Sequence, residues 1–281
     1  MPRPPVPEGG RRIDLHAHTS YSDGMLTPEA LIAHARVRNL AAIAVTDHDS
    51  VDALAEARMA AGSTLEVVPG IEISTAMNGL DLHILGYFVD PQDEELTARL
   101  ARFRQERLDR ALAIVERLRV LGAPVDADQV MASAGPGVVG RPHIADALVR
   151  AGHVDSLETA FRRYLGPRGE AFVARPAFRP EDAITLIDRA GGLSVLAHPG
   201  AGLAVSMVEH LASEGLRGLE VWHPQHGPTT VRHYRALAAK LGLLETGGSD
   251  FHGVGRSLDL GDIAVPWSVL GALKDAAGVA G

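Results

Sequence analysis

The stretch Ile13-Asp-Leu-His-Ala-His18 ends a short apolar run with two histidines that are one residue apart. Because alternate side chains of a β-strand share a face, His16 and His18 point the same way where the strand meets a loop. Two neutral imidazoles directed at one point supply half of a metal site. Surface histidines at a strand end are the alternative for this pair, and the rest of the chain favours the metal site.

Five further apolar runs end at or near a residue that can bind a metal ion. Each is short, rich in Val, Ile and Leu, and bounded by Gly, Pro or Asn, which is typical of a buried parallel strand. The runs cover residues 42–48, 67–72, 80–83, 193–198 and 243–252, and their candidate ligands are His48, Glu72, His83, His198, Asp250 and His252. Independent core histidines would not all fall at strand ends, so the pattern predicts one shared site.

Strand and helix patterns alternate in two blocks that flank a purely helical segment at about 93–165. We expect strands at 12–16, 41–46, 66–74, 80–89, 193–197, 217–222, 243–246 and 261–265, and barrel helices at 28–38, 51–61, 180–190, 204–214, 228–241 and 267–276. These seven or eight strand–helix units predict an α/β barrel, whose active site lies at the carboxyl ends of the strands. The expected layout is a disordered lead-in over 1–11, a barrel formed by 12–91 and 176–281, and a helical insertion over 92–175 that caps the active site.

The composition limits the metal ligands and the binding partners that the protein can have. The 281 residues include no cysteine, which excludes disulfides, thiolate catalysis and zinc-finger sites. A metal ion must therefore be held by histidine and carboxylate groups, which favours Mn, Fe or Zn. The net charge of −8 argues against binding to duplex nucleic acid. The chain has no bilayer-spanning apolar stretch and no apolar segment typical of an export signal, so we expect a cytoplasmic protein that does not bind membranes.

Nine side chains form the candidate metal cluster: His16, His18, Asp23, His48, Glu72, His83, His198, Asp250 and His252. This number exceeds the needs of one ion, so the sequence predicts two or three divalent ions that share bridging carboxylates. Ions about 3.5–4 Å apart lower the pKa of a bridging water, and the resulting hydroxide can attack a phosphoester in line. Asp14, Asp47 and Asp49 flank candidate ligands, and we expect one or two of them to orient a histidine ring. Solvent exposure or a helix cap is the alternative for Asp49.

Six segments resemble the successive motifs of the PHP (polymerase and histidinol phosphatase) family. They are Asp14-Leu-His-Ala-His-Thr-Ser-Tyr-Ser-Asp-Gly24, Thr46-Asp-His-Asp49, Pro69-Gly-Ile-Glu72, Leu82-His83, Ala197-His-Pro-Gly200 and Gly248-Ser-Asp-Phe-His-Gly253. The resemblance covers almost the whole chain. It implies a distorted (β/α)7 barrel with an inserted small helical domain and up to three ions, often Mn²⁺, with Fe²⁺ or Zn²⁺ as alternatives.

The resemblance also implies how the ligands divide among the ions. One ion would be held by His16, His18, Glu72 and Asp250, a second by Glu72, His83 and His198, and a third by Asp23, His48 and His252. Glu72 would then bridge two ions. We expect Glu72, Asp250 and His198 to contribute most directly to catalysis.

Within the family, the chain is most similar to stand-alone members with a helical insertion, which are nucleoside 3′,5′-bisphosphate phosphatases and 5′→3′ oligoribonucleotide exonucleases. The similarity implies an enzyme that hydrolyses a nucleoside 3′,5′-bisphosphate to the nucleoside 5′-monophosphate, or removes 5′-end nucleotides from short single-stranded RNA. Histidinol-phosphate phosphatase is the alternative within the family. The sequence leaves the oligomeric state open.

Arginines of the helical segment are the candidates for binding the substrate phosphate, because the chain has only two lysines and an arginine fork suits phosphate. On a helical wheel, Arg104 and Arg107 fall within the apolar sector of the long helix, and Arg110 lies nearer its rim. A buried arginine is costly unless an anion meets it, and an internal acidic partner or a snorkelling side chain is the alternative. Arg141 and His143 open another helix and resemble the family's phosphate-contacting segment.

Three further residues have weaker support as contacts of the substrate. Arg168 lies in a Gly-Pro-Arg-Gly loop, where a solvated charge is the alternative to a phosphate contact. His223 and His226 follow the strand at 217–222 and are candidates for a proton donor or a base-stacking residue at the pocket rim, with a core or surface position as the alternative. None of the three therefore decides the function.

Two other classes of function compete with the phosphoesterase. Binuclear amidohydrolase barrels also begin with His-x-His, but they commonly need a carbamylated lysine on a middle strand. Lys240 falls in a helix pattern and Lys274 lies near the C-terminus, which disfavours that class. A non-catalytic PHP module would show missing ligands, and every ligand position of this chain is filled.

Overall fold

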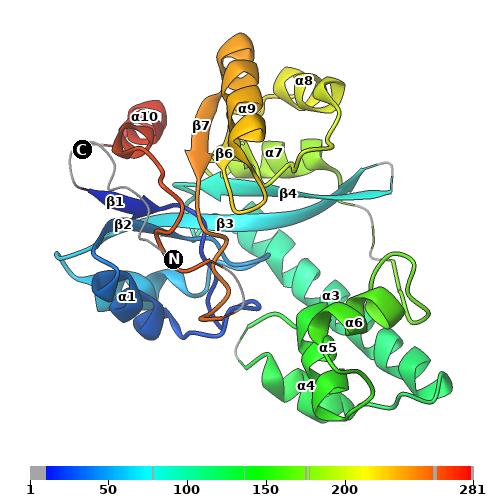
Figure 1. The fold of residues 1–281 in the computed structure, drawn as a ribbon. Helices are drawn as coiled ribbons and strands as arrows, with labels where there is room; N and C mark the ends of the chain where they lie inside the picture. Colours follow the sequence, from blue (N-terminus) through cyan, green and yellow to red (C-terminus); the bar gives the residue numbers. More distant parts are fainter. Residues whose placement is uncertain are drawn as a thin grey trace.

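The computed structural model describes residues 11–77, 79–135, 137–174, 176, 178–255 and 258–279. Figure 1 shows a curved sheet flanked by helices, with a separate group of helices on one side. Residues 1–10 of the expected lead-in lie outside the described residues. No helix in the described part of the chain is long and apolar enough to cross a membrane.

Seven strands form the sheet in the order of the sequence. The strands are β1 (Arg12–Asp14), β2 (Leu40–Val45), β3 (Glu66–Met77), β4 (Leu80–Tyr87), β5 (Leu193–Leu196), β6 (Gly218–Trp222) and β7 (Leu244–Gly247). Neighbouring strands are parallel except at β4, which is antiparallel to both β3 and β5. The expectation that each run is a parallel strand is therefore wrong for the run at 80–83, because β4 follows β3 through a tight connection.

The two edges of the sheet meet beyond β1 and β7. The backbone N–H of Leu15 donates to Gly247 O at 3.2 Å, and Ala17 pairs with Phe251 in a parallel bridge. The sheet therefore curls into a distorted seven-stranded barrel. Its outer face packs on helices through fully buried side chains such as Ile43, Ile71 and Ile84.

Six helices surround the barrel: α1 (Pro28–Val37), α2 (Leu54–Ala61), α7 (Pro180–Arg189), α8 (Val205–Ser213), α9 (Pro228–Leu241) and α10 (Trp267–Ala277). The first begins as its sequence predicts, since the Thr27 side chain accepts from Ala30 N and Pro28 occupies the first turn. The strand expected at 261–265 is wrong. Gly261 adopts a φ of +67° in a turn there, and its N–H donates to buried Asp14 rather than to a neighbouring strand.

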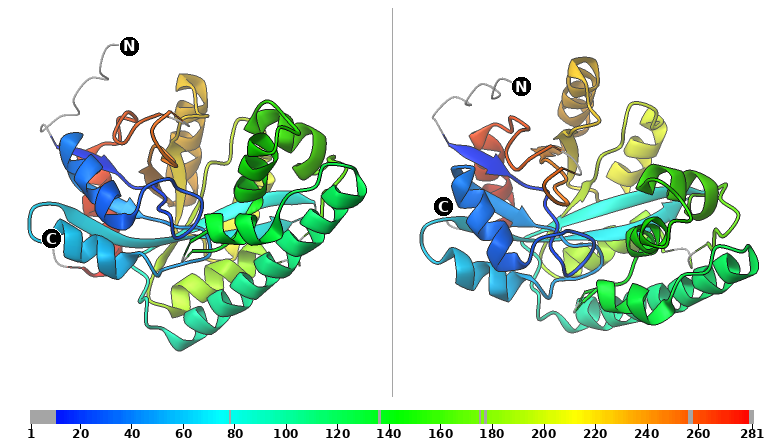
Figure 2. Two further views of the ribbon diagram at one scale, coloured as in Figure 1. Left: turned by 90° about the horizontal axis from the view of Figure 1, so that it is seen from below. Right: turned by 60° about the horizontal axis from the view of Figure 1, so that its bottom comes forward.

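The insertion consists of α3 (Glu94–Val120), α4 (Ala127–Ser133), α5 (Arg141–Arg150), α6 (Leu157–Ala160) and the π-helical turn η1 (Phe161–Leu165). Figure 2 shows these helices beside the barrel. Helix α3 belongs to two cores, because Leu100 and Phe103 pack with the barrel whereas Ile114 and Leu118 pack with the other inserted helices. The insertion therefore has its own apolar core and is joined to the barrel through one long helix.

A second contact joins the insertion to the loop that follows β1. The N–H of Val138, just before α5, donates to Tyr21 O at 3.0 Å. A Cβ atom at Gly137 would lie 2.4 Å from Tyr21 O, so only glycine allows this approach of the two backbones.

Candidate metal centre

Glu72 is the centre of the candidate cluster. It lies in the middle of β3 and is fully buried. Five histidine nitrogens surround its carboxylate at 2.8–3.3 Å, and they are His16 Nε2, His18 Nε2, His48 Nδ1, His83 Nδ1 and His198 Nε2. The last two face Oε1 and the others face Oε2, so the two oxygens divide the histidines between them. This arrangement suits a carboxylate that bridges two cations.

His83 reaches Glu72 from an antiparallel strand. It pairs with Ser74 across β3 and β4, and it lies in the first half of β4 rather than at a carboxyl end. Because β4 runs in the opposite direction, its beginning lies at the edge where the other strands end. The reversal of β4 therefore places His83 in the cluster, whereas the sequence suggested the carboxyl end of a parallel strand.

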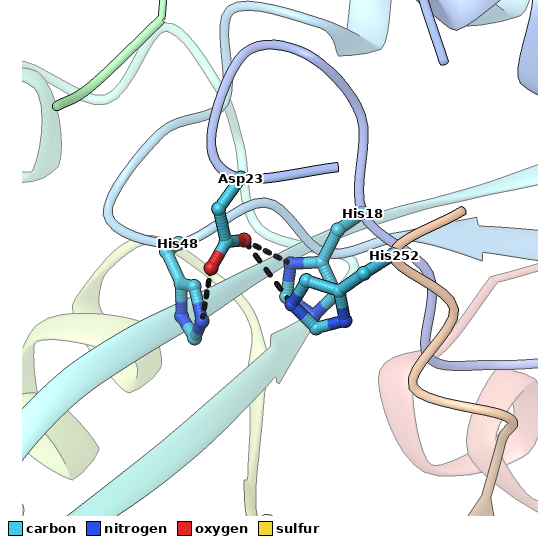
Figure 3. A group of neighbouring side chains, drawn as sticks. All are labelled: His18, Asp23, His48 and His252. Atoms are coloured by element: carbon cyan, nitrogen blue, oxygen red, sulfur yellow. Dashed lines mark ion pairs between the residues drawn. The ribbon is translucent and has the colours of Figure 1, made fainter. Parts of the chain in front are cut away.

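A second group forms around Asp23, which lies in the loop after β1 (Figure 3). Its carboxylate is 3.1 Å from His252 Nε2 and 3.9 Å from both His48 Nε2 and His18 Nδ1. His18 and His48 thus present one ring nitrogen to Asp23 and the other to Glu72. The two groups are contiguous and form one cluster.

Asp250 closes the cluster from the loop after β7. Its Oδ1 is 3.2 Å from His18 Nε2 and 3.4 Å from His16 Nε2, and its Oδ2 is 3.4 Å from His223 Nε2. With Asp250 in place, all nine predicted ligands meet at one mouth of the barrel. Their grouping by distance differs from the implied division, because His48 lies with Glu72 and His83 as well as with Asp23.

The donor set fits divalent metal ions. His18 Nε2 and His48 Nδ1 are buried and make no hydrogen bond within the described residues, although both lie within 3.3 Å of Glu72 Oε2. Such buried nitrogens normally have a partner, and a cation is the partner that imidazole and carboxylate groups share. The cluster offers nitrogen and oxygen donors and no thiolate, which suits Mn, Fe or Zn.

The charges of the cluster favour cations. Burial raises the pKa of Glu72, but the surrounding histidines outweigh this effect and hold the pKa well below its usual range. Histidines outweigh burial for Asp23 and Asp250 in the same way. Burial lowers the pKa of His48 to about 3, which leaves its ring neutral and able to bind a cation. Neutral pH therefore gives ionised carboxylates throughout the cluster.

A cavity separates the cluster from the insertion. Asp23, His48, Ser74 and His83 line its barrel side. The opposite side combines three arginines with an apolar wall, and consists of Arg107, Arg110, Ala111, Ile114, Val139, Gly140, Arg141, Pro142, Ile144 and Phe161. A molecule in this cavity would touch the candidate metal ligands at one end and guanidinium groups at the other.

A family model, described as the PHP domain, matches residues 14–175. The chain belongs to the PHP family. It is 35% identical to the 3′,5′-nucleoside bisphosphate phosphatase of Chromobacterium violaceum over 92% of this chain and 96% of that protein. It is 36% identical to the 5′-3′ exoribonuclease Rnm of Escherichia coli over 85% of this chain and 84% of the enzyme. As a PHP protein similar to these enzymes along most of its length, the chain is a hydrolase.

A solved structure has the same fold. A Bifidobacterium adolescentis protein assigned to the metal-dependent phosphoesterases superposes with a TM-score of 0.89, at 32% identity and over 98% of both chains. The match confirms a PHP barrel with a helical insertion. The positions of the two lysines also disfavour a binuclear amidohydrolase. Lys240 lies on α9 and pairs with Glu209. Lys274 lies on α10 and pairs with Glu66, and both lysines are away from the barrel mouth.

Three of the six residues predicted to contact substrate line the cavity of this PHP protein, and three do not. Arg107, Arg110 and Arg141 line it. Arg104 is half-exposed and pairs with Asp52, so the expectation that it faces inward is wrong. The helical wheel placed it within the apolar sector, but the long side chain leaves the edge of that sector toward the residues that precede α2.

The other two residues also lie outside the cavity lining. The side chain of His143 turns back, and its Nδ1 accepts from Gly140 N at 3.0 Å, so it caps its own helix. Arg168 is exposed in the turn after η1. His143 is therefore held by its own helix start and Arg168 lies in a surface turn, so neither side chain contacts the cavity.

The three acidic residues that flank candidate ligands, Asp14, Asp47 and Asp49, each accept a hydrogen bond from a backbone N–H. Asp14 accepts from Ser249 N at 2.9 Å, Asp47 from Thr19 N at 2.7 Å and Asp49 from Ser74 N at 2.8 Å. These bonds hold the ligand-bearing loops against one another, in place of the predicted bonds to histidine rings. The carboxylate that contacts the far side of a candidate ligand ring is Glu220, at 3.0 Å from His16 Nδ1. A buried acid inside the apolar strand at 217–222 was the only sequence signal for it.

His223 and His226 occupy core positions. His223 is buried and its Nε2 lies 3.4 Å from Asp250 Oδ2. The Nδ1 of His226 donates to Val221 O at 2.9 Å, and its Nε2 accepts from Gly200 N at 3.1 Å. Both therefore stabilise the loops that carry PHP ligands and do not line the cavity.

Proposed function

We propose that this enzyme hydrolyses a nucleoside 3′,5′-bisphosphate to the nucleoside 5′-monophosphate. The observation that carries the proposal is the cavity between the candidate metal centre and Arg107, Arg110 and Arg141. A metal cluster beside a group of arginines suits a substrate with two phosphates, one bound at each end. The activity named for the Chromobacterium violaceum relative supports the same substrate.

We further propose that the nine candidate ligands hold two or three divalent ions, with Mn²⁺ as the first choice and Fe²⁺ or Zn²⁺ as alternatives. Such ions, when bound, supply Lewis acidity and lower the pKa of water. Glu72 would be the bridging ligand, since both of its oxygens face histidines. Asp23 and Asp250 add negative charge on either side of it, which stabilises the cations in a buried site.

Arg141 is the arginine best suited to bind the phosphate that is not hydrolysed. Its Nη2 lies 3.3 Å from Asp81 Oδ2 and its Nη1 lies 3.4 Å from Leu165 O. Both contacts are long for hydrogen bonds, and Asp81 is half-exposed, so a phosphate dianion can replace them. Binding of that phosphate would orient the nucleotide and place the other phosphate at the metal centre.

Arg107 has a different part in this proposal. Its Nε donates to Asp49 Oδ2 at 2.8 Å, and its Nη2 donates to Ser74 Oγ at 3.0 Å. These bonds join α3 to the loop after β2 and to β3. Arg107 would therefore fix the distance between the arginines and the metal centre, in addition to lining the cavity.

Removal of 5′-end nucleotides from short single-stranded RNA is the second candidate activity. The apolar wall formed by Ile114, Ile144 and Phe161 gives a nucleobase a surface to contact without sequence-specific hydrogen bonds. The Escherichia coli relative is named as a 5′-3′ exoribonuclease. A terminal nucleotide with phosphates on both sides would present the same two charged groups as a bisphosphate.

A phosphate-release screen with Mn²⁺ tests the proposal. We expect the highest kcat/KM for nucleoside 3′,5′-bisphosphates, with 5′-phosphorylated oligoribonucleotides assayed in parallel for release of 5′-end nucleotides. A preference for histidinol phosphate would replace the proposed substrate with that of the alternative PHP enzyme. No hydrolysis of any phosphoester by metal-loaded protein would reject the proposal.

A further inference from the structure

Glu220 is a buried carboxylate next to the candidate metal centre that none of the PHP motifs includes. It lies on β6 and has no exposed surface. Its Oε1 is 3.0 Å from His16 Nδ1, and its Oε2 accepts from the backbone N–H of His198 at 2.7 Å. Both oxygens are thus engaged by residues that carry candidate ligand rings, and a buried carboxylate needs such partners.

The contact with His16 fixes the position of a proton. A carboxylate accepts hydrogen bonds, so Glu220 requires a proton on Nδ1 of the ring. The lone pair of a neutral His16 is then on Nε2, which faces Glu72 Oε2 at 3.3 Å and Asp250 Oδ1 at 3.4 Å. Glu220 thereby selects the tautomer that can bind a cation between those two carboxylates.

The hydrogen bond from the His198 N–H to Glu220 stabilises the backbone conformation of His198. His198 has a φ of +24°, which is an unfavourable conformation for a residue other than glycine. The bond from its N–H to Glu220 stabilises this turn at the end of β5. The turn directs the His198 ring to Glu72, where Nε2 lies 2.9 Å from Oε1.

We propose that Glu220 is a positioning residue that orients His16 and His198 for metal binding while remaining outside the ligand set itself. One carboxylate would in this way set the geometry of two histidines that come from different strands and face different oxygens of Glu72. The inference rests on the metal site proposed above. Metal binding by the wild-type chain tests that site, and the difference between variant and wild type tests Glu220.

Glu220→Gln is the informative variant because it keeps the size of the side chain. A single amide oxygen can accept from His16 or from His198 but not from both, and the NH₂ group then faces the other donor. We expect Mn²⁺ affinity, measured by EPR of the free ion, to fall 10- to 100-fold, as is usual for the loss of such a partner. In ¹⁵N-edited NMR of the Zn²⁺-loaded protein, His16 should lose its Nδ1-protonated signature or His198 should lose the bond to its N–H.

Glu245→Gln is the matched control. Glu245 lies on the neighbouring strand β7, is partly exposed and pairs with Arg235, so the same change removes one charge without touching the cluster. Its Mn²⁺ affinity and its histidine spectrum should equal those of the wild type. Wild-type affinity together with an unchanged His16 tautomer in a folded Glu220→Gln protein would overturn the proposal.

The wild-type protein gives a test that does not depend on the folding of the variant. In the Zn²⁺-loaded chain, His16 should keep the proton on Nδ1 and bind the ion through Nε2. A Zn²⁺-loaded protein in which His16 is protonated on Nε2 would overturn the proposal, whatever the variant does.

Discussion

The barrel mouth and the insertion present their charged side chains in opposite ways. Around Glu72, the candidate ligands come from strands and strand-end loops and are buried or nearly so. Across the cavity, the arginines come from two helices, and Arg141 keeps only long contacts. The first arrangement allows few alternative geometries, whereas the second leaves Arg141 able to exchange partners.

This difference separates two requirements of the proposed reaction. Metal ions need ligands at fixed positions, and a barrel with interlocked loops provides them. A substrate must enter and leave, so the groups that grip its second phosphate must be available for new hydrogen bonds. The insertion has its own core and shares one long helix with the barrel, so its arginines lie on elements that carry none of the candidate ligands.

Changes at the centre of the barrel mouth should have the largest effect. Glu72→Gln or Asp250→Asn removes a charge from the cluster, so kcat/KM should fall by several orders of magnitude. The far-UV circular dichroism spectrum should stay unchanged, because both substitutions preserve size. His233→Asn, on the exposed surface of α9, is the control. Equal losses in all three variants would show that the ligand assignment is wrong.

His34 is unsuitable as such a control, although its place on α1 suggests a neutral position. Its Nε2 is 2.6 Å from Asp259 Oδ1, and its ring stacks on Phe251. Phe251 is fully buried between Asp250 and His252, so a change at His34 can reach two candidate ligands.

Removal of the Arg141 side chain should reduce kcat/KM less than removal of a candidate ligand does, and the reduction should depend on the substrate. Arg141→Ala should cost about 2–3 kcal/mol of transition-state stabilisation for a nucleoside 3′,5′-bisphosphate, in the range of a lost charged contact. A simple aryl phosphate has no second phosphate and should lose far less, as kcat/KM for the two substrates would show. An equal loss on both would mean that Arg141 acts on the reacting phosphate or on the fold.

Arg107→Ala should differ from Arg141→Ala. Its removal leaves Asp49, which is buried, without the guanidinium that bonds to Oδ2. We therefore expect losses on both substrates together with a lower Tm. The pair of variants separates binding of the second phosphate from attachment of the insertion.

Metal binding should stabilise the barrel mouth more than the insertion. At ten times its Kd, Mn²⁺ should add about 1.4 kcal/mol to the free energy of unfolding. Hydrogen exchange should slow at β3 and at the loops carrying Asp23 and Asp250, with little change in α4–α6. Uniform protection of both regions would contradict the separation described above.

Stability and Mn²⁺ affinity should both depend on pH through His252. Burial lowers the pKa of His252, but Asp23 outweighs it and raises the pKa to about 10. In the metal-free protein this raised pKa stabilises the fold fully below pH 6.5, and the contribution disappears as the pH rises toward 10. A metal ion must displace that proton, so Mn²⁺ affinity should increase between pH 6.5 and 9. A lower affinity at higher pH would contradict the assignment of His252 as a ligand.

Arginines outside the cavity should have the smallest effects. Arg104 and Arg168 are exposed, so alanine at either position should change stability and kcat/KM by less than about 0.5 kcal/mol. A loss for the bisphosphate comparable to that of Arg141→Ala would extend the substrate contacts beyond the cavity lining.

The sequence was most informative where the spacing of residues alone determines their direction. Alternation places His16 and His18 on one face of an extended segment, and family motifs identify Glu72 and Asp250. The reversal of β4 was not predictable in this way, because a strand pattern carries no direction, and His83 enters the cluster through that reversal. The fold class and the residues that gather at the barrel mouth could therefore be predicted, although the path of one strand could not.

Positions decided by long side chains or by distant partners were harder to predict. Arg104 shares a helical sector with buried residues, yet its flexible chain reaches Asp52 instead of the cavity. Glu220 contacts His16 from 204 residues away, so no local pattern marks it. The turn at Gly261 replaces an expected strand because Asp14, far away in the sequence, accepts its N–H.

The bond between Val138 and Tyr21 bears on how such enzymes can diversify. Tyr21 is two residues from Asp23, and Val138 is three residues from Arg141, so a single backbone contact ties a candidate ligand loop to the helix that carries Arg141. An insertion or deletion at 137–140 would displace both at once. Exchange of the helical segment between related barrels would therefore require the loop at 19–24 to be exchanged with it, and new specificities would arise more readily on the apolar wall at Ile114 and Phe161.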